Sequence, residues 1–385
     1  MAVDVANFGT DPPPISRSIR NFRRVPCPDI DSAGFVDQLQ KFIREEGHDM
    51  LIPADDQALT AITEHYYELK DLLIVACPPP EITNQILDKS STLAAAQKIG
   101  MRIPNTELIS SSSRLFELSS SFAFPWVLKP SKKEVREEEV KSLNLASSED
   151  LAAKIPHGRE FNPPMLLQEY CGGAGVGVEL LMHEGECVTV FQHRRLKELP
   201  YTGGVSVSAV AEEPSPKLVE NSISLLRALR WDGPAMVEFK FNSDTGDAVF
   251  MEVNGRYWGT IGLPISAGID FPLYHWQLLH GQTPAVPNQY ATGASWRWTA
   301  GHVVRIHGLL RAARRSSAAR DELRRTLSSF PASSNILVGD AMFSSRDRTP
   351  AVRELWHIVK VLFVCDMKEL AGRLLPREEQ RSLLQ

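Results

Sequence analysis

The clearest alternation of apolar and polar residues lies in two neighbouring segments, Pro234–Phe241 and Ala248–Val253. The residues between them, 242–247, are polar and include a glycine, which is typical of a turn. Alternating runs on either side of such a turn predict two antiparallel strands joined as a hairpin.

Four polar side chains are expected on one face of this hairpin. Residues two apart in a strand point to the same side, so Glu252, Asn254 and Arg256 share a face. Glu238 is expected opposite them on the partner strand. Carboxylate and amide oxygens suit Mg²⁺, and arginine suits phosphate or carboxylate. An ordinary polar outer face is the alternative, and the spacing favours the metal and phosphate interpretation.

The N-terminal part of the chain alternates between expected helices and strands. The expected elements are a Pro-rich irregular segment over 1–31, a helix over Phe35–Glu46, a strand over Met50–Pro53, a helix from Asp55 to about Leu69, and a strand over Leu72–Cys77. This alternation predicts a parallel α/β layer. Such a layer normally opens with a strand and a glycine-rich turn. Because no segment fits that unit, we expect the chain to begin partway into its first domain.

The middle of the chain is expected to be rich in strands and the C-terminal region rich in helices. Asp88 is expected to cap a helix that ends at Gly100. The further expected elements are strands over 124–130, 165–170, 176–182, 187–192 and 205–211, a helix over 216–230, and mostly helical structure over 286–385. Trp296, Trp298 and His302 are expected in the core of that last region. The order predicts an α/β fold class.

Composition and charge narrow the classes of function. The chain has 385 residues, enough for two or three domains, and its 43% hydrophobic and 23% charged residues are ordinary for a soluble globular protein. The net charge of −5 argues against a general nucleic-acid binder, and five scattered cysteines fit a reducing cytosol. The N-terminus shows no signal peptide, and the apolar run Leu355–Val364 is too short to span a membrane. We therefore expect a cytoplasmic protein with no nucleic-acid partner and no membrane span.

Further candidate binding and catalytic residues lie at or near the ends of expected helices and strands. They are Lys89, Lys129, the run Gln168, Glu169, Tyr170 and Cys171, then Glu179, Arg194 and Arg195. Each alone has an ordinary structural interpretation, such as a solvated lysine, a turn or a solvent-facing glutamate. Taken in order together with the hairpin set, they resemble the ATP-grasp superfamily.

The resemblance rests on short motifs spread from about Ile19 to Leu355. They are Asp88-Lys89, Leu128-Lys129-Pro130, Leu167-Gln168-Glu169-Tyr170 and Glu252-Val253-Asn254-Gly255-Arg256. Within the superfamily the chain looks most like the carboxylate–amine ligase branch, with a carbamoyl-phosphate-synthase-like ATP-binding domain. Sequence motifs typical of that branch are found at Val25–Asp29, Leu51–Asp56 and Pro200–Gly204.

The resemblance implies a chain of three parts. They are a partial N-terminal parallel α/β domain over 1–87, an ATP-grasp domain over 88–285 and a mostly helical C-terminal region over 286–385. Within the ATP-grasp domain, 88–168 would form the small ATP-binding lobe region and 169–285 the metal and substrate lobe. These two α+β subdomains would clasp ATP between them.

The resemblance also implies a role for each candidate residue. Lys89 and Lys129 would hold ATP phosphates, the run Gln168, Glu169, Tyr170 and Cys171 would hold the adenine chiefly through backbone groups, and Glu179 would approach the ribose or the adenine. Glu238, Glu252 and Asn254 would bind Mg²⁺, with Mn²⁺ as an alternative. Arg256, with Arg194 or Arg195, would hold the transferred phosphoryl group and the carboxylate.

The implied activity is an ATP- and Mg²⁺-dependent ligase that joins a small carboxylic acid to an amine, such as an amino acid, through an acyl phosphate. Two alternatives stay open. One is a degenerate nucleotide-binding ATP-grasp protein without ligase activity, and the other is a bicarbonate-activating enzyme of the carboxylase type. The second is less favoured because the chain has no Met-Lys-Met biotinyl site and no second ATP-grasp unit. The oligomeric state is open, with homodimers common among relatives.

One segment departs from the superfamily pattern. Members often carry a glycine-rich loop after the second lysine, where backbone N–H groups hold phosphate. Here Ser131–Lys141 is densely charged. Lys132 and Lys133 are candidates to replace those backbone contacts.

Overall fold

The computed structural model separates the chain into two compact units. The described residues are 2–8, 14–119, 121, 123–133, 142–201, 203–314, 316–329, 339–344 and 346–374. The terminal unit comprises Met1–Val25, Leu196–Val210 and Ala294–Gln385, and the central unit comprises Pro26–Arg195 and Ala211–Gly293. The domain boundaries expected from the sequence stay a prediction.

The central unit begins with a small α/β layer. Its elements are α1 (Ser32–Glu46), β3 (Met50–Leu51), α2 (Asp56–Glu64), α3 (Tyr66–Lys70), β4 (Ile74–Val75) and α4 (Pro80–Leu87). β3 and β4 pair in parallel, as the alternation predicts. The expected helix from Asp55 to Leu69 is interrupted at His65, which ends α2 and precedes α3. Asp55 caps α2, because its side chain accepts a hydrogen bond from the backbone N–H of Ala58.

A four-stranded sheet follows in the central unit. Its strands, in spatial order, are β5 (Thr106–Ser111), β8 (Glu160–Glu169), β6 (Trp126–Pro130) and β7 (Leu143–Leu145). Two short helices accompany it, α6 (Ser112–Leu118) and α7 (Ser148–Lys154). Trp126 and Leu128 are fully buried in the cluster of apolar side chains behind this sheet. The alternation along β6 therefore turns Lys129 away from that core.

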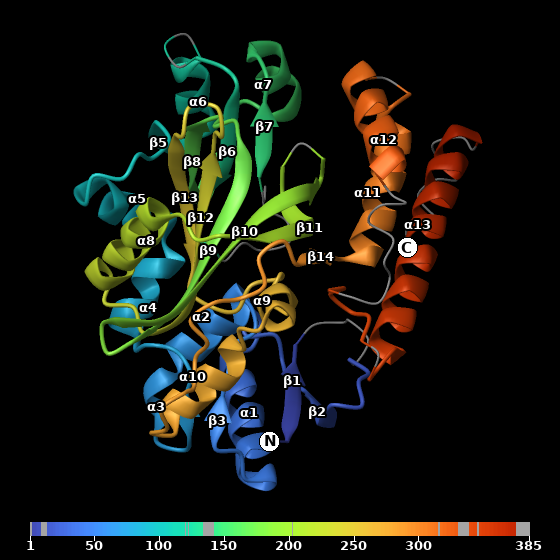
Figure 1. Ribbon diagram of the computed structural model, residues 1–385. Helices are drawn as coiled ribbons and strands as arrows, with labels where there is room; N and C mark the ends of the chain where they lie inside the picture. The colour runs from blue at the N-terminus through green and yellow to red at the C-terminus, as the bar shows by residue number, and fades with distance from the viewer. Residues whose placement is uncertain are drawn as a thin grey trace. The chain divides into compact units, whose positions relative to one another are not determined.

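The second antiparallel sheet carries the predicted hairpin. Its central-unit strands lie in the order β13 (Ala248–Asn254), β12 (Gly233–Phe241), β9 (Ala174–His183) and β10 (Glu186–Leu199). Helices α5 (Lys89–Lys98) and α8 (Pro216–Ala228) bury apolar side chains against one face of β9, β12 and β13 (Figure 1). The opposite face is left for the polar residues described below. The unit also contains α9 (Gly262–Ala267) and α10 (Phe271–Leu279).

The terminal unit combines short strands with three helices. Its elements are β1 (Val3–Asn7), β2 (Ile19–Arg24), most of β11 (Val205–Glu212), β14 (Ser295–Arg297), α11 (Thr299–Ala312), α12 (Ser317–Ser329) and α13 (Thr349–Leu374). β1 pairs in parallel with β2, so the expectation of an irregular segment over 1–31 is wrong. The prolines that suggested irregularity lie between and after these two strands. Trp296 and His302 are buried, as expected.

The fold class predicted from the sequence is confirmed. The structure contains small parallel pairs near the N-terminus, two antiparallel sheets and C-terminal helices. No helix in the described part of the chain is long and apolar enough to cross a membrane. Cys27, Cys77, Cys171 and Cys187 are free thiols.

Candidate functional site

The hairpin of β12 and β13 places its polar side chains next to one another. Glu238 lies directly across from Glu252, and Met236 across from Asn254. The amide nitrogen of Asn254 donates to Oε1 of Glu238 at 2.8 Å. The antiparallel pairing and the shared face are therefore confirmed for these three polar residues.

On the other side of β12, a glycine makes room for more polar groups. Gly177 of β9 lies between Glu238 on β12 and His193 on β10. A Cβ atom at Gly177 would lie 2.6 Å from Cε1 of His193, which is closer than real Cβ contacts. Glycine is therefore required for the ring to lie where it does.

Arg195 extends this polar row from β10 to the hairpin. Its Nη2 lies 2.6 Å from Oε2 of Glu238, and both side chains are 15% exposed. Arg194 takes a different partner, because its Nε donates to Glu212 and its side chain is 41% exposed. The sequence left open which of the two arginines serves the site, and the structure brings only Arg195 to Glu238.

Glu179 and His193 form a buried pair across β9 and β10. The Nδ1 atom of the imidazole contacts Oε1 of Glu179, and both side chains are at most 1% exposed. Burial raises the pKa of the Glu179 carboxyl, and the neighbouring His193 opposes that shift. Oε2 of Glu179 and Nε2 of His193 have no hydrogen-bond partner among the described residues. The sequence places His193 beside the candidate Arg194 and Arg195 but assigned it no role, and the expected approach of Glu179 to the ribose or adenine stays a prediction.

The two predicted phosphate lysines lie near the hairpin acids. Lys89 is the first residue of α5, and its Nζ donates to the carbonyl of Pro130 at 3.2 Å. Its backbone N–H donates to Ser131, which ties the start of α5 to the end of β6. Burial lowers the pKa of the Lys129 ammonium, and the carboxylate of Glu252 opposes that shift.

Lys133 reaches the same acids from the charged segment after β6. Its side chain is 3% exposed. Its Nζ donates to the carbonyl of Val253 and, at 2.7 Å, to Oδ1 of Asn254. Lys132, in contrast, is exposed. Residues 134–141, the remainder of the segment that departs from the glycine-rich pattern, lie outside the described residues.

Several cations act on Glu252. Burial alone would raise the pKa of its carboxyl. The charges of Lys133, Lys89 and Lys129 outweigh burial and hold that pKa well below its usual range. A carboxylate that stays ionised among lysines is suited to bind a divalent cation next to anionic phosphate.

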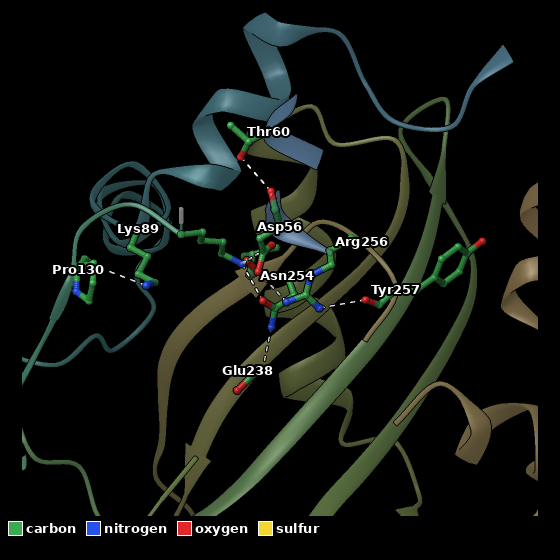
Figure 2. A network of polar contacts seen from close by, with 10 residues as sticks. Asp56, Thr60, Lys89, Pro130, Glu238, Asn254, Arg256 and Tyr257 are labelled. Carbon is green, nitrogen blue, oxygen red and sulfur yellow. Dashed lines mark hydrogen bonds and ion pairs between the residues drawn. The ribbon is translucent and has the colours of Figure 1, made fainter. Parts of the chain in front are cut away.

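Arg256 follows β13 and is held by two contacts (Figure 2). Its Nη2 donates to Oδ2 of Asp56 at 2.7 Å, and its Nη1 donates to the carbonyl of Tyr257 at 3.0 Å. Burial tends to lower the pKa of this guanidinium, and the carboxylate of Asp56 reverses that effect and raises it. The sequence analysis treated Asp56 only as part of a helix start and of the Leu51–Asp56 motif. An acidic residue just after a helix cap was the one signal of a further role.

The run from Gln168 to Cys171 leaves the four-stranded sheet at the end of β8. The side chain of Gln168 is buried and donates to Oγ1 of Thr106 at 2.9 Å. Tyr170 is 50% exposed. Burial raises the pKa of the Cys171 thiol, and the neighbouring Glu169 adds to that shift. The contact of this run with adenine stays a prediction.

The predicted metal ligands fit Mg²⁺ by the type of their atoms. They supply two carboxylates and one amide oxygen on adjacent strands. Among the described residues, no group of three or more His, Cys, Asp or Glu side chains is arranged to hold a metal ion. Mg²⁺ needs few protein ligands, because water molecules and substrate phosphates fill the rest of its coordination shell. Lys133 and Arg195 now contact oxygen atoms of this set.

Part of the chain matches a known protein family. Residues 161–301 match the family described as ATP-grasp in the biosynthetic pathway with Ter operon. The matched region contains the second antiparallel sheet from β9 to β13 and therefore most of the candidate site.

Known proteins resemble longer parts of the chain. The N-terminal section of the carbamoyl phosphate synthase large chain of Methanopyrus kandleri is 24% identical over 184 residues, which cover 44% of this chain and 31% of that protein. The chain thus spans less than a third of that relative's length. The fold is similar to an ADP complex of N5-carboxyaminoimidazole ribonucleotide synthetase, with a TM-score of 0.58 and 15% identity over 78% of this chain and 75% of that one. It is also similar to L-amino acid ligase from Bacillus licheniformis, with a TM-score of 0.51 and 16% identity over 66% of this chain and 61% of that one.

Proposed function

Because the chain carries a domain of the ATP-grasp superfamily, we propose that it is an ATP-dependent ligase. In this proposal it joins a carboxylate to an amine, such as an amino acid, through an acyl phosphate. The observation that carries the proposal is the buried array around Glu252. There lysines, arginines and carboxylates from six separate segments act on one another.

The lysines in this array suit the phosphates of ATP. Lys89 and Lys129 come from α5 and β6, and their charges both act on Glu252. A lysine ammonium binds phosphate as a compact point charge. In the proposal these two residues hold the phosphates, and the neighbouring strand end at Gln168–Cys171 receives the adenine.

Glu238, Glu252 and Asn254 would hold Mg²⁺, or Mn²⁺, at the phosphates. When bound, the metal supplies positive charge that stabilises the transferring phosphoryl group. In this proposal the protein keeps the Glu252 carboxylate ionised and holds both carboxylates on adjacent strands. The hydrogen bond from Asn254 and the ion pair with Arg195 hold the Glu238 carboxylate in place.

The arginines would serve the reacting groups. A substrate carboxylate oxygen attacks the terminal phosphorus of ATP, the bond to ADP breaks, and an acyl phosphate results. The amine then attacks the acyl carbon, phosphate leaves, and the proton of the amine is lost to a base. This chemistry needs in-line positioning and charge neutralisation more than covalent help from the protein. In the proposal Arg256 and Arg195 would bind the anionic oxygens of the transferred phosphoryl group and the carboxylate, which is supported by their contacts with Asp56 and Glu238.

A second activity remains a candidate. The match to a carbamoyl phosphate synthase large chain favours activation of bicarbonate as the carboxylic acid. The same residues would serve that reaction, because bicarbonate also presents an oxygen nucleophile to ATP. The substrate therefore decides between the two activities.

The proposed function is tested by measuring ADP and phosphate release with Mg²⁺ and ATP. The purified chain is incubated with pools of carboxylic acids and amines, separately and together, and with bicarbonate. Release that needs one acid and one amine pool supports the ligase. Release with bicarbonate alone supports the second activity. ATP binding without turnover in every pool contradicts both and favours a degenerate nucleotide-binding protein.

A further inference from the structure

Asp56 brings a carboxylate from the N-terminal α/β layer into the candidate site. It is the first residue of α2, and 200 residues of sequence separate it from Arg256. Its Oδ2 accepts from Nη2 of Arg256 at 2.7 Å, and its Oδ1 lies 3.9 Å from Nζ of Lys133. The three side chains are 22%, 19% and 3% exposed, in the order Asp56, Arg256 and Lys133. One carboxylate therefore faces two cations of the site.

The backbone of Asp56 is fixed independently of these contacts. Its neighbour Asp55 caps α2 through the N–H of Ala58 at 2.7 Å. The hydroxyl of Thr60 donates to the carbonyl of Asp56 at 2.9 Å (Figure 2). The cap thus belongs to Asp55, and the side chain of Asp56 remains available for Arg256.

The contact with Asp56 sets the direction of the Arg256 guanidinium. A guanidinium is planar, so holding Nη2 at Asp56 and Nη1 at Tyr257 fixes the whole fork. The Nε atom is then buried with no hydrogen-bond partner among the described residues. A buried donor without a partner is costly, and an anionic oxygen of a ligand would satisfy it.

Asp56 also offers Lys133 a third acceptor, besides the carbonyl of Val253 and Oδ1 of Asn254. Lys133 now donates to Oδ1 of Asn254, one of the proposed metal ligands. Oδ1 of Asp56 is buried and has no hydrogen-bond partner among the described residues. If Asn254 held a metal ion through Oδ1, the Lys133 ammonium would still have Oδ1 of Asp56, which lies 3.9 Å from its Nζ.

We infer that Asp56 is a positioning residue of this site, which orients Arg256 toward the terminal phosphate of ATP and receives Lys133 when the metal ligands are engaged. The inference rests on the proposed function, because it takes the ligand of Arg256 to be a phosphoryl group. Through Asp56, the N-terminal α/β layer would then help to orient the residues that bind the transferred phosphoryl group.

The test compares Asp56→Asn with Asp55→Asn in the full chain. Both variants remove one negative charge at the start of α2, and asparagine serves as a helix cap as well as aspartate does. Titration calorimetry measures the affinities for ATP and for ADP, each with Mg²⁺. We expect Asp56→Asn to weaken ATP binding by about tenfold, the scale of one charge-assisted hydrogen bond, while ADP binding and the unfolding midpoint stay close to the wild type. Asp55→Asn should leave both affinities unchanged.

Three results would overturn the inference. One is ATP binding that is unchanged or tighter in Asp56→Asn, since Asp56 would then be neutral or would compete with the ligand for Arg256. Another is an equal loss of ATP and ADP affinity, which indicates a general structural role. The third is an equal effect in Asp55→Asn. Failure of the ligase assay leaves this test intact, because it measures binding, whereas a wild-type chain that binds neither nucleotide contradicts both proposals.

Discussion

Two arginines, one in each unit, differ in how the protein pairs their guanidinium groups. Arg305 in the terminal unit is 3% exposed, and every nitrogen of its guanidinium has a partner. Nε donates to the carbonyl of Glu198, Nη1 to Thr326 and Nη2 to Glu322. Each of its three nitrogens thus donates to a group of the protein itself, which ties the guanidinium into the fold.

Arg256 in the central unit has a different set of contacts. Two of its nitrogens are paired, and the third, Nε, is buried without a partner among the described residues. Buried polar groups in folded proteins are nearly always hydrogen-bonded, so an exception points to strain or to a missing ligand. In the proposed account, Arg305 stabilises the fold and Arg256 binds a ligand.

The largest effect is expected where the proposed metal ligands are lost. Glu252→Ala should lower ATP-dependent turnover by about a thousandfold, because it removes charge stabilisation of the phosphoryl group. Its unfolding midpoint should fall as well, because the substitution leaves the buried ammonium groups of Lys129 and Lys133 with one carboxylate fewer, so turnover is compared per folded molecule. ADP release and urea unfolding check the two parts. Wild-type ADP release in this variant would show that Glu252 is not a metal ligand.

The next effect concerns the fold-stabilising arginine. Arg305→Lys cannot reproduce three divergent hydrogen bonds with one ammonium. We expect a loss of about 2–3 kcal/mol in the free energy of unfolding, measured by urea denaturation. Turnover per folded molecule should stay at the wild-type level. A large loss of turnover without a loss of stability would remove the distinction between the two arginines.

A smaller effect separates the lysines. Lys129→Ala should weaken ATP binding by about ten- to a hundredfold, the scale of a lost charge contact to phosphate. Lys132→Ala is the matched control, because that side chain is exposed and should change the affinity little. Equal losses in the two variants would show that the charged segment has taken over the phosphate contact.

The smallest effect tests the polar row between β12 and β10. Gly177→Ala pushes a Cβ atom into the buried ring of His193. It should lower the free energy of unfolding by about 1–3 kcal/mol, as overpacking does. Gly259→Ala is the control, because nothing lies within 4 Å of a Cβ atom there. Equal stability of the two variants would mean that the ring has room to move.

The sequence predicted those elements that depend on interactions between residues close together in the chain. The β12–β13 hairpin follows from alternation and a polar turn, and the cap of α5 at Asp88 follows from residue type. Both involve residues close in sequence. The break at His65 and the parallel pairing of β1 with β2 did not follow, because tertiary packing and pairing across a Pro-rich segment determine them.

The site was predicted as a set of residues but not as a network. Single motifs place Lys129 and Glu252 at the ends of strands. Nothing local indicates that Lys133 contacts Asn254, 121 residues later, or that Asp56 contacts Arg256. Such contacts depend on how the layers of the central unit pack, and that packing is visible only in three dimensions.

The most direct measurement compares Arg256→Lys with Arg305→Lys for ATP-dependent ADP release and for unfolding. The account predicts that Arg256→Lys loses about a hundredfold in turnover, because a point charge replaces a planar fork, and unfolds at the wild-type midpoint. Arg305→Lys should show the reverse, with lower stability and full turnover per folded molecule. Retained turnover in Arg256→Lys, together with a loss of stability, would show that Arg256 is structural and would contradict the assignment of the site.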